Sequence, residues 1–260
     1  MVDLSIVLPA YNEGRIIAGS LERLAGFLDA HSGDAGLWST WEILVVDDGS
    51  LDDTGEVALA AAAREPRILV TRLGVNSGKG AAVKAGVARA SGSVILLTDV
   101  DLSYALEDLG HAVRTLRSAP SGEELDMVFG DRRHPSSRLD FALASLGHVM
   151  RRQVISLVFN RTVRLVYGLP WRDTQCGLKG FRREAAVRIM PLLRTTRFLA
   201  DIEMFIIAGR LGLKVGRIPV HLTYLSDSST VHVVGQSPRV LADALKIKSA
   251  QLRGRYGPRE

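Results

Sequence analysis

The chain has 260 residues, of which 47% are hydrophobic, and a formal net charge of +5. This is an ordinary globular composition, long enough for one large α/β domain or two small ones. The single cysteine, Cys176, excludes an internal disulfide, and no C-x-x-C or H-E-x-x-H pattern indicates zinc. The positive charge permits a phosphate-rich partner but does not distinguish a nucleotide from a nucleic acid or an anionic lipid.

The N-terminal sequence lacks the basic segment and the apolar run of a signal peptide. No stretch approaches the roughly 20 apolar residues that cross a bilayer. We therefore expect a cytoplasmic protein, with peripheral attachment to the cytoplasmic face of a membrane as the alternative.

Short apolar runs alternate with helical patterns along the first 130 residues. The predicted strands are Leu4–Leu8, Ile43–Val46, Arg67–Thr71, Val94–Thr98 and Met127–Phe129, and the predicted helices are Ile16–Ala30, Thr54–Ala63, Ala81–Ala90 and Leu106–Leu116. This alternation predicts a mostly parallel sheet with helices on both faces. In such sheets, ligands bind beyond the carboxyl ends of the strands.

Unusual residues follow the first four predicted strands, in the segments PAYNEG, DDGSLDDT, LGVNSGKG and DVDLS. Asp47 and Asp48 can accept hydrogen bonds from a base or a ribose, and Lys79 stands at a helix start that favours a phosphate. Taken singly, Asn12, Gly14 and Ser50–Asp52 are better explained as helix caps, and Lys79 as a solvated lysine. Their convergence on one edge of the sheet predicts a nucleotide site.

Asp99 and Asp101 are separated by one apolar residue after the strand predicted at 94–98. Side chains two apart on an extended strand point to the same face, and two like charges repel each other unless they are neutralised. Hard divalent cations bind one or two carboxylates together with phosphate oxygens. We therefore expect Mg²⁺ or Mn²⁺ at this pair, against the alternative of ordinary turn chemistry.

The segments SIVLPAYNE, ILVVDDGSLDDT, NSGKGAAVKAG and DVD resemble, in this order, the family 2 glycosyltransferases of GT-A fold. The later WRDTQCGLKGFRREAA and FLADIEM look like the branch of dolichyl-phosphate glucosyltransferases and polyprenyl-phosphate sugar synthases. The resemblance runs from about residue 4 to 220 and implies an α/β GT-A fold with a Rossmann-like, mostly parallel sheet. We expect one catalytic domain at 1–230, with a nucleotide-sugar half (1–130) and an acceptor half (131–230), before a C-terminal amphipathic helix and basic tail at 231–260.

The resemblance also implies roles for particular residues. Asp99 and Asp101 would bind the metal, and Asp101 is the more direct and catalytic ligand. Asp201, with Glu203, lies where relatives with hydroxyl acceptors place a catalytic base, although a helix N-terminus that favours acids explains both equally well. The implied nucleotide-sugar-binding residues are Pro9, Tyr11, Glu13, Asp47, Asp48, Lys79 and Asp99.

Arginines and apolar residues interleave between residues 132 and 172. Such a basic amphipathic segment can lie on an anionic membrane, or it can form core-packing helices or a dimer interface. The resemblance favours contact with a lipid phosphate. The candidate acceptor-binding residues are Arg132, Arg133, Arg151, Asp173 and Gln175. The C-terminal amphipathic helix is either a second membrane contact or a homodimerisation element.

The resemblance predicts a metal-dependent inverting glycosyltransferase that moves a hexose from a UDP- or GDP-hexose, with glucose from UDP-glucose as the expected donor, to a polyprenyl or dolichyl phosphate. A lipid phosphate is largely ionised at neutral pH and attacks without a base, whereas a hydroxyl needs a carboxylate to take its proton. A soluble hydroxyl acceptor, which would make Asp201 essential, is the alternative. A nucleic-acid-binding module rests on charge alone, since aromatic stacking positions and a recognition-helix motif are missing; we expect no nucleic-acid partner.

Overall fold

The computed structural model describes residues 2–34, 37–118, 124–140, 157, 159–223 and 238–257. Its strands are β1 (Leu4–Ala10), β2 (Trp41–Asp47), β3 (Ile68–Arg72), β4 (Val94–Leu97), β5 (Met127–Gly130), β6 (Arg138–Asp140), β7 (Lys179–Arg182), β8 (Val215–Ile218) and β9 (His221–Thr223). Its helices are α1 (Ile17–Ala30), α2 (Thr54–Arg64), α3 (Lys79–Arg89), α4 (Glu107–Arg117), α6 (Arg183–Ile189), α7 (Ala200–Arg210) and α8 (Pro238–Leu252), with a 3₁₀ turn at Met190–Leu192. Residues 159–167 are also helical.

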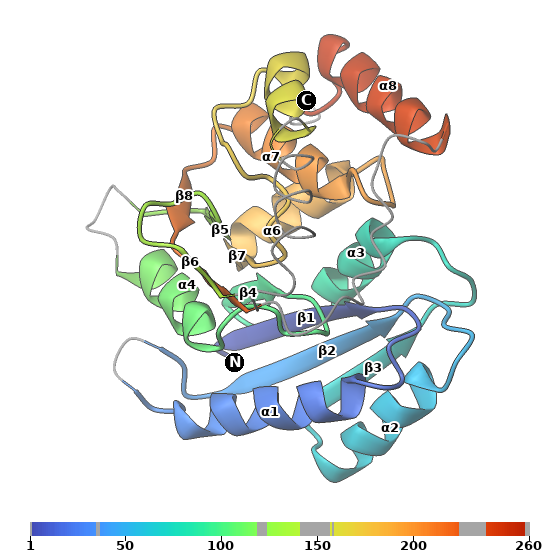
Figure 1. Ribbon diagram of the computed structural model, residues 1–260, viewed down its shortest axis with the longest axis vertical. Helices are drawn as coiled ribbons and strands as arrows, with labels where there is room; N and C mark the ends of the chain where they lie inside the picture. Colours follow the sequence, from blue (N-terminus) through green and yellow to red (C-terminus); the bar gives the residue numbers. More distant parts are fainter. Residues whose placement is uncertain are drawn as a thin grey trace.

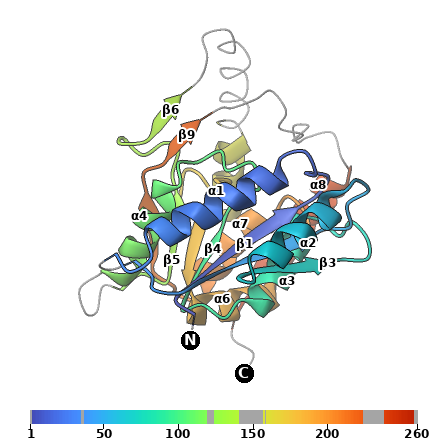
Figure 2. The same ribbon diagram turned by 90° about the horizontal axis from the view of Figure 1, so that it is seen from below.

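Seven strands form one sheet in the order β3-β2-β1-β4-β7-β5-β8, and β6 pairs with β9 in a small separate sheet (Figures 1 and 2). The pairs among β3, β2, β1 and β4 are parallel, which confirms the mostly parallel sheet predicted from the sequence. Strand β7 is antiparallel to both of its neighbours, β4 and β5. Because Lys179 pairs with Leu97, the residues just before β7 reach the same edge of the sheet as the residues just after β4.

Helices cover both faces of the sheet and bury a hydrophobic core on each (Figure 1). Leucines of α1 and α4, among them Leu21, Leu24 and Leu116, pack on one face. On the other face, α3, α6 and α7 pack against residues such as Val7 and Phe129. All seven residues of β2 are buried, as expected for a strand covered on both sides. The sheet is therefore a rigid support whose loops at one edge are free to bind a ligand.

The structure corrects two boundaries that matter for the site. The strand predicted at 94–98 ends at Leu97, so the following acids lie in a turn. The C-terminal helix ends at Leu252, and the chain then folds back so that Tyr256, in the predicted basic tail, is buried at 1% exposure. Strands β6, β8 and β9 were not among the predicted strands. The division at residue 130 stays a prediction, and the sheet is continuous across it.

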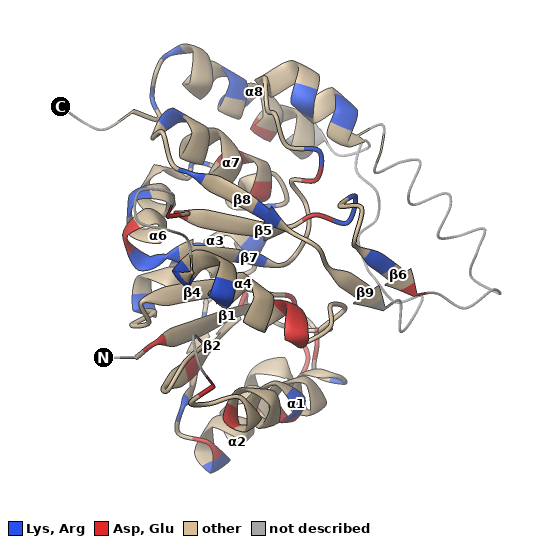
Figure 3. Ribbon diagram, turned by 90° about the vertical axis from the view of Figure 1, so that its left-hand side faces the viewer, with Lys and Arg blue, Asp and Glu red and all other residues tan. Residues whose placement is uncertain are grey.

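Most of the basic amphipathic segment, residues 141–156, lies outside the described part of the chain. None of the helices that the structure describes is long and apolar enough to cross a membrane. Lysine and arginine positions are spread along α8 (Figure 3). Two of these lysines form hydrogen bonds to neighbouring segments: Lys246 Nζ donates to Arg194 O and Lys248 Nζ to Val166 O, each at 2.6 Å.

Helix α3 packs so closely on the sheet that Gly86 has no room for a side chain, because a Cβ there would collide with Val7. We expect Gly86→Ala to lower the free energy of unfolding by about 1–3 kcal/mol through overpacking. In Gly26→Ala on α1, where the added methyl meets open space, the higher helix propensity of alanine should instead stabilise the protein by up to about 1 kcal/mol. Urea denaturation of both variants measures these changes in the free energy of unfolding. Equal changes in the two variants would contradict the close packing at Gly86.

Candidate active site

Loops from several strands meet at one edge of the sheet. The strands β1, β2 and β4 run parallel, and β5 runs in the same direction because both β4 and β5 are antiparallel to β7. Their carboxyl ends therefore share an edge with the start of β7 and the start of α3. Of the predicted site residues in the described part of the chain, Pro9 and Asp47 lie in the last residues of β1 and β2. The others lie on loops or helix starts near this edge.

Asp47 and Asp48 hold two of these loops in place. Asp48 is buried and accepts hydrogen bonds from Gly78 N at 2.7 Å and from Ser77 N at 2.8 Å. Asp47 is fully buried, accepts a bond from Ser50 N at 2.8 Å and pairs with Arg72 at 3.0 Å. These contacts make both carboxylates anchors of the loops. Contact of either with a nucleobase stays a prediction.

The loop after β1 is tied to the loop after β2. Asn12, in a left-handed conformation with φ of 56°, donates its N–H to Ser50 Oγ and accepts from Leu51 N at 2.9 Å. These bonds fix Tyr11 and Glu13 on either side of Asn12. Tyr11 is 38% exposed, so its ring is available to a ligand at this edge.

The two acids after β4 do not lie on an extended strand, so the expectation that they share a strand face is wrong. Buried Val100 anchors a turn in which Leu102 N donates to Asp99 O at 3.2 Å. Asp99 Oδ1 accepts a bond from Lys79 Nζ at 2.5 Å. Asp101 Oδ1 accepts a bond from Ser103 Oγ at 2.8 Å. The turn therefore directs the two carboxylates to different partners.

Two lysines and two aspartates form the centre of the site, which we call the lysine–aspartate cluster: Lys79, Asp99, Lys179 and Asp201. Lys79 bonds Asp99 as above. Lys179, only 1% exposed, donates to Cys176 O at 2.6 Å and forms an ion pair with Asp201 Oδ1 at 2.9 Å. A buried lysine needs such partners because an unpaired charge in the interior is strongly unfavourable.

The two pairs also act on each other. Burial opposes the charge of Lys79, but the nearby carboxylates of Asp99 and Asp201 raise its pKa above the usual value. Burial likewise opposes the charge of Asp99, while Lys79, Lys179 and Arg132 lower its pKa. Asp99 and Lys79 are therefore both charged at neutral pH. Positive and negative groups alternate through the cluster.

The acids around Asp101 suit a divalent cation bound together with a phosphate group. Burial, and then the charges of Asp101, Asp52 and Asp99, raise the pKa of Glu13, so this corner has an excess of negative charge. Among the described residues, no three His, Cys, Asp or Glu side chains are arranged to hold a metal ion by themselves. Asp99 and Asp101 supply two carboxylates, and Mg²⁺ commonly combines one or two with substrate phosphates. The residues present therefore fit a metal that arrives with a phosphorylated ligand.

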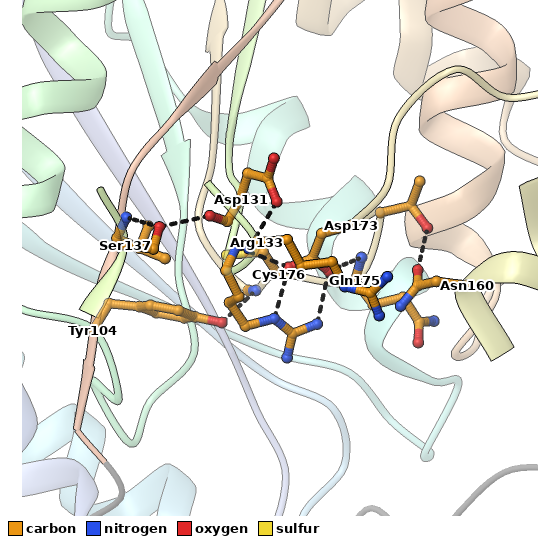
Figure 4. A network of polar contacts seen from close by, with 12 residues as sticks. Tyr104, Asp131, Arg133, Ser137, Asn160, Asp173, Gln175 and Cys176 are labelled. Atoms are coloured by element: carbon orange, nitrogen blue, oxygen red, sulfur yellow. Dashed lines mark hydrogen bonds and ion pairs between the residues drawn. The ribbon is translucent and has the colours of Figure 1, made fainter. Parts of the chain in front are cut away.

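The loop after β5 is joined to the 173–176 loop by a buried ion pair (Figure 4). Arg132 donates from Nε and Nη2 to the two oxygens of Asp173, each at 2.7 Å, and its backbone N–H also donates to Asp173. Burial opposes ionisation of Asp173, but Arg132 holds the pKa of that carboxyl below its usual range. The predicted acceptor residues Arg132 and Asp173 thus bind each other. Arg133 donates its backbone N–H to Asp131 next to them.

Two other residues of the 173–176 loop behave differently from each other. Gln175 Nε2 is buried, and no hydrogen-bond partner for it lies among the described residues, so this predicted acceptor residue has a spare donor there. Cys176 is fully buried, and burial raises the pKa of its thiol to about 11. Cys176 is therefore a packed residue and not a nucleophile. Arg151 lies outside the described residues.

Of the two acids considered as a base, Glu203 is fully buried and accepts four hydrogen bonds, so it does not face the site. Asp201 keeps 13% of its side chain exposed but is bound to Lys179. Sequence reasoning missed Lys179, because a lysine inside the apolar run CGLKGF looks like a residue on a solvated strand face. What marks Lys179 as a site residue is its position opposite the end of β4. That position results from the antiparallel insertion of β7 and is visible only in the structure.

The Lys179–Asp201 pair can be tested by denaturation. We expect Asp201→Asn to lower the free energy of unfolding by about 3–5 kcal/mol, because it leaves a buried ammonium without its counter-charge. Lys179→Met combined with Asp201→Asn should recover most of this loss. Urea unfolding of the single and double variants gives the coupling energy, and strictly additive effects would contradict the pair.

Comparison with known proteins gives the family. The model for glycosyl transferase family 2 matches residues 5–189. The chain is 32% identical over 248 residues to dolichyl-phosphate beta-glucosyltransferase ALG5A of Trichomonas vaginalis, covering 95% of this chain and 73% of that protein. It is 30% identical over 240 residues to human dolichyl-phosphate beta-glucosyltransferase, covering 88% and 69%.

A solved structure shares the fold. Glucosyl-3-phosphoglycerate synthase from Mycobacterium tuberculosis, in complex with Mn²⁺, UDP-glucose and phosphoglyceric acid, superposes with a TM-score of 0.58 at 19% identity, covering 100% of this chain and 81% of that one. The family model matches most of the strands of the sheet, and both relatives align over nearly the whole chain. This protein therefore belongs to glycosyl transferase family 2 and is a glycosyltransferase.

Proposed function

We propose that this glycosyltransferase moves glucose from UDP-glucose to a polyprenyl phosphate of the dolichyl type, with inversion at C1 of the sugar. Relatives at 30–32% identity are named dolichyl-phosphate beta-glucosyltransferases, which supports the sugar and the acceptor. The structurally similar synthase, bound to Mn²⁺ and UDP-glucose, supports the donor and the metal.

The observation that carries the proposal is the ion pair between Asp201 and the buried Lys179 at 2.9 Å. A general base must be free to accept a proton, and a carboxylate stabilised by a fixed ammonium accepts one poorly. A phosphate acceptor needs no base, because it is already ionised near neutral pH. The paired Asp201 therefore fits a phosphate nucleophile better than a hydroxyl.

The donor side of the proposal uses the loops after β1, β2 and β4. Tyr11 and Glu13 border the nucleotide, and Lys79 approaches the diphosphate from the start of α3, where backbone N–H groups also favour anions. Asp99 and Asp101 would hold Mg²⁺ or Mn²⁺ against the diphosphate. Such an ion stabilises negative charge on the departing nucleoside diphosphate.

The acceptor side uses the loops at 131–133 and 173–175. Asp173 fixes the Arg132 guanidinium near the cluster, and an arginine so oriented can bind phosphate oxygens bidentately. Arg133, Gln175 and Arg151 are the further acceptor candidates. Since a polyprenyl tail resides in a bilayer, peripheral contact with the cytoplasmic face of a membrane is part of this proposal.

A donor panel tests the proposal. Purified protein with Mn²⁺ or Mg²⁺ is incubated with UDP- and GDP-sugars, with and without a short polyprenyl phosphate, and released nucleoside diphosphate is measured. We expect release from UDP-glucose that requires the lipid and is lost in Asp101→Ala. Lys179→Met combined with Asp201→Asn should keep kcat within about tenfold of the wild type, because removal of a true general base costs about 10²–10⁴-fold.

Two outcomes would contradict this account. Release that does not need the lipid phosphate would indicate a soluble acceptor. A loss of kcat beyond about a hundredfold in the double variant, with the fold intact by circular dichroism, would indicate that Asp201 acts as the base.

Lys79 gives a second test, which does not depend on turnover. Because its ammonium lies 2.5 Å from Asp99 Oδ1, it competes with a cation for that carboxylate until a diphosphate attracts it. We expect Lys79→Met to bind Mn²⁺ about tenfold more tightly without nucleotide and UDP about tenfold more weakly, since one charge-assisted hydrogen bond contributes on this scale. Titration calorimetry measures both affinities.

The matched control is Lys84→Met, which removes an exposed lysine from the same helix. It should change neither affinity beyond twofold. Unchanged Mn²⁺ binding in Lys79→Met would show that Lys79 does not occupy the metal's carboxylate in solution.

A further inference from the structure

Glu203 joins three separate parts of the chain at a buried point. Its Oε2 accepts bonds from Thr195 N at 2.8 Å and Thr195 Oγ1 at 2.6 Å. Its Oε1 accepts bonds from Arg194 N at 3.0 Å and from the Tyr256 hydroxyl at 2.6 Å. Glu203 is fully buried, so its carboxyl group has no contact with solvent. Among the described residues, these four donors supply the hydrogen bonds that water would otherwise provide.

The loop held by Glu203 lies directly on the start of α3. Thr196 O accepts a bond from Ala81 N at 3.0 Å. At Gly78, which has φ of 101°, a Cβ would stand 2.5 Å from the same Thr196 oxygen. The backbone on either side of Lys79 is therefore packed against this loop, and a shift of the loop would move the lysine.

Tyr256 reaches Glu203 because α8 is docked on the rest of the protein. Ile247 and Ala250 of α8 are buried in the core on the α7 side of the sheet. After the helix ends, the chain folds back and buries Tyr256 at 1% exposure. The C-terminal segment thus contributes a hydroxyl to a chain of contacts that ends at the donor site.

We propose that Tyr256 is a positioning residue for the transfer reaction: through Glu203 and the loop at 194–196, it holds the start of α3, and with it Lys79, in the geometry that binds the nucleoside diphosphate. The inference rests on the proposed donor site. Its distinguishing consequence is a change in nucleotide affinity caused by a residue that does not contact the nucleotide.

The test compares Tyr256→Phe with Tyr167→Phe. Tyr167 is also buried, and its hydroxyl donates to Ala244 O on α8 at 3.0 Å. Its loss removes one hydroxyl bond to the same helix, while buried Ile247 and Ala250 keep α8 docked and Tyr256 keeps its bond to Glu203. We expect Tyr256→Phe to raise the Kd for UDP and the KM for UDP-glucose about fivefold with kcat within twofold, since small displacements of a binding group are costly. Tyr167→Phe should leave the Kd for UDP, the KM for UDP-glucose and kcat unchanged.

Hydrogen exchange provides a readout that does not depend on the donor's identity. Peptides that contain Ala81 should exchange faster in Tyr256→Phe and at the wild-type rate in Tyr167→Phe. If Tyr256→Phe does not fold, Thr195→Val, which removes another donor to Glu203, should give the same pattern. Equal exchange and equal UDP affinity in the two tyrosine variants would overturn the proposal. Failure of the wild type to bind UDP would instead count against the proposed donor, and the exchange data would still decide the role of Tyr256.

Discussion

The ion pair between Lys179 and Asp201 is the constraint on which the rest of the site depends. Lys179 enters the sheet at the first residue of β7, opposite Leu97, and is almost completely buried there. A charge at that position requires a counter-charge, and the first turn of α7 supplies it. The same pairing places a positive charge near Asp99 and leaves Lys79 to bond that acid directly. In the proposed function, these alternating charges determine where a cation and a diphosphate bind.

This arrangement gives the two halves of the chain a common centre. The parallel strands bring the loops with Glu13, Asp48 and Asp101 to one edge, as the strand and helix pattern predicts. The antiparallel strand β7 brings the 173–179 loop to the same edge. Arg132, held by Asp173, also lowers the pKa of Asp99, so the loops at 131–133 and 173–176 are within electrostatic reach of the loop after β4.

Much of this could be predicted from the sequence because it is local. Apolar periodicity predicted most of the strands and helices within a few residues, and four motifs at strand ends predicted loops that the structure brings together at one edge of the sheet. What the sequence did not reveal depends on long-range contacts. The turn at Asp99 depends on the burial of Val100. The burial of Lys179 depends on an antiparallel strand inserted far from its neighbours in sequence, and the burial of Tyr256 depends on the docking of α8 against residues 166 and 167. No local pattern distinguishes a buried, paired lysine from a solvated one.

The most direct test of the account is a comparison of two acceptors that differ only in the nucleophile: a short polyprenyl phosphate and the polyprenol of the same chain length, each with radiolabelled UDP-glucose and Mn²⁺. The account predicts a single acid-labile glucosyl phosphate product from the phosphate and no product from the alcohol, because the paired Asp201 does not activate a hydroxyl. A stable glucoside formed from the alcohol at a comparable rate would contradict it.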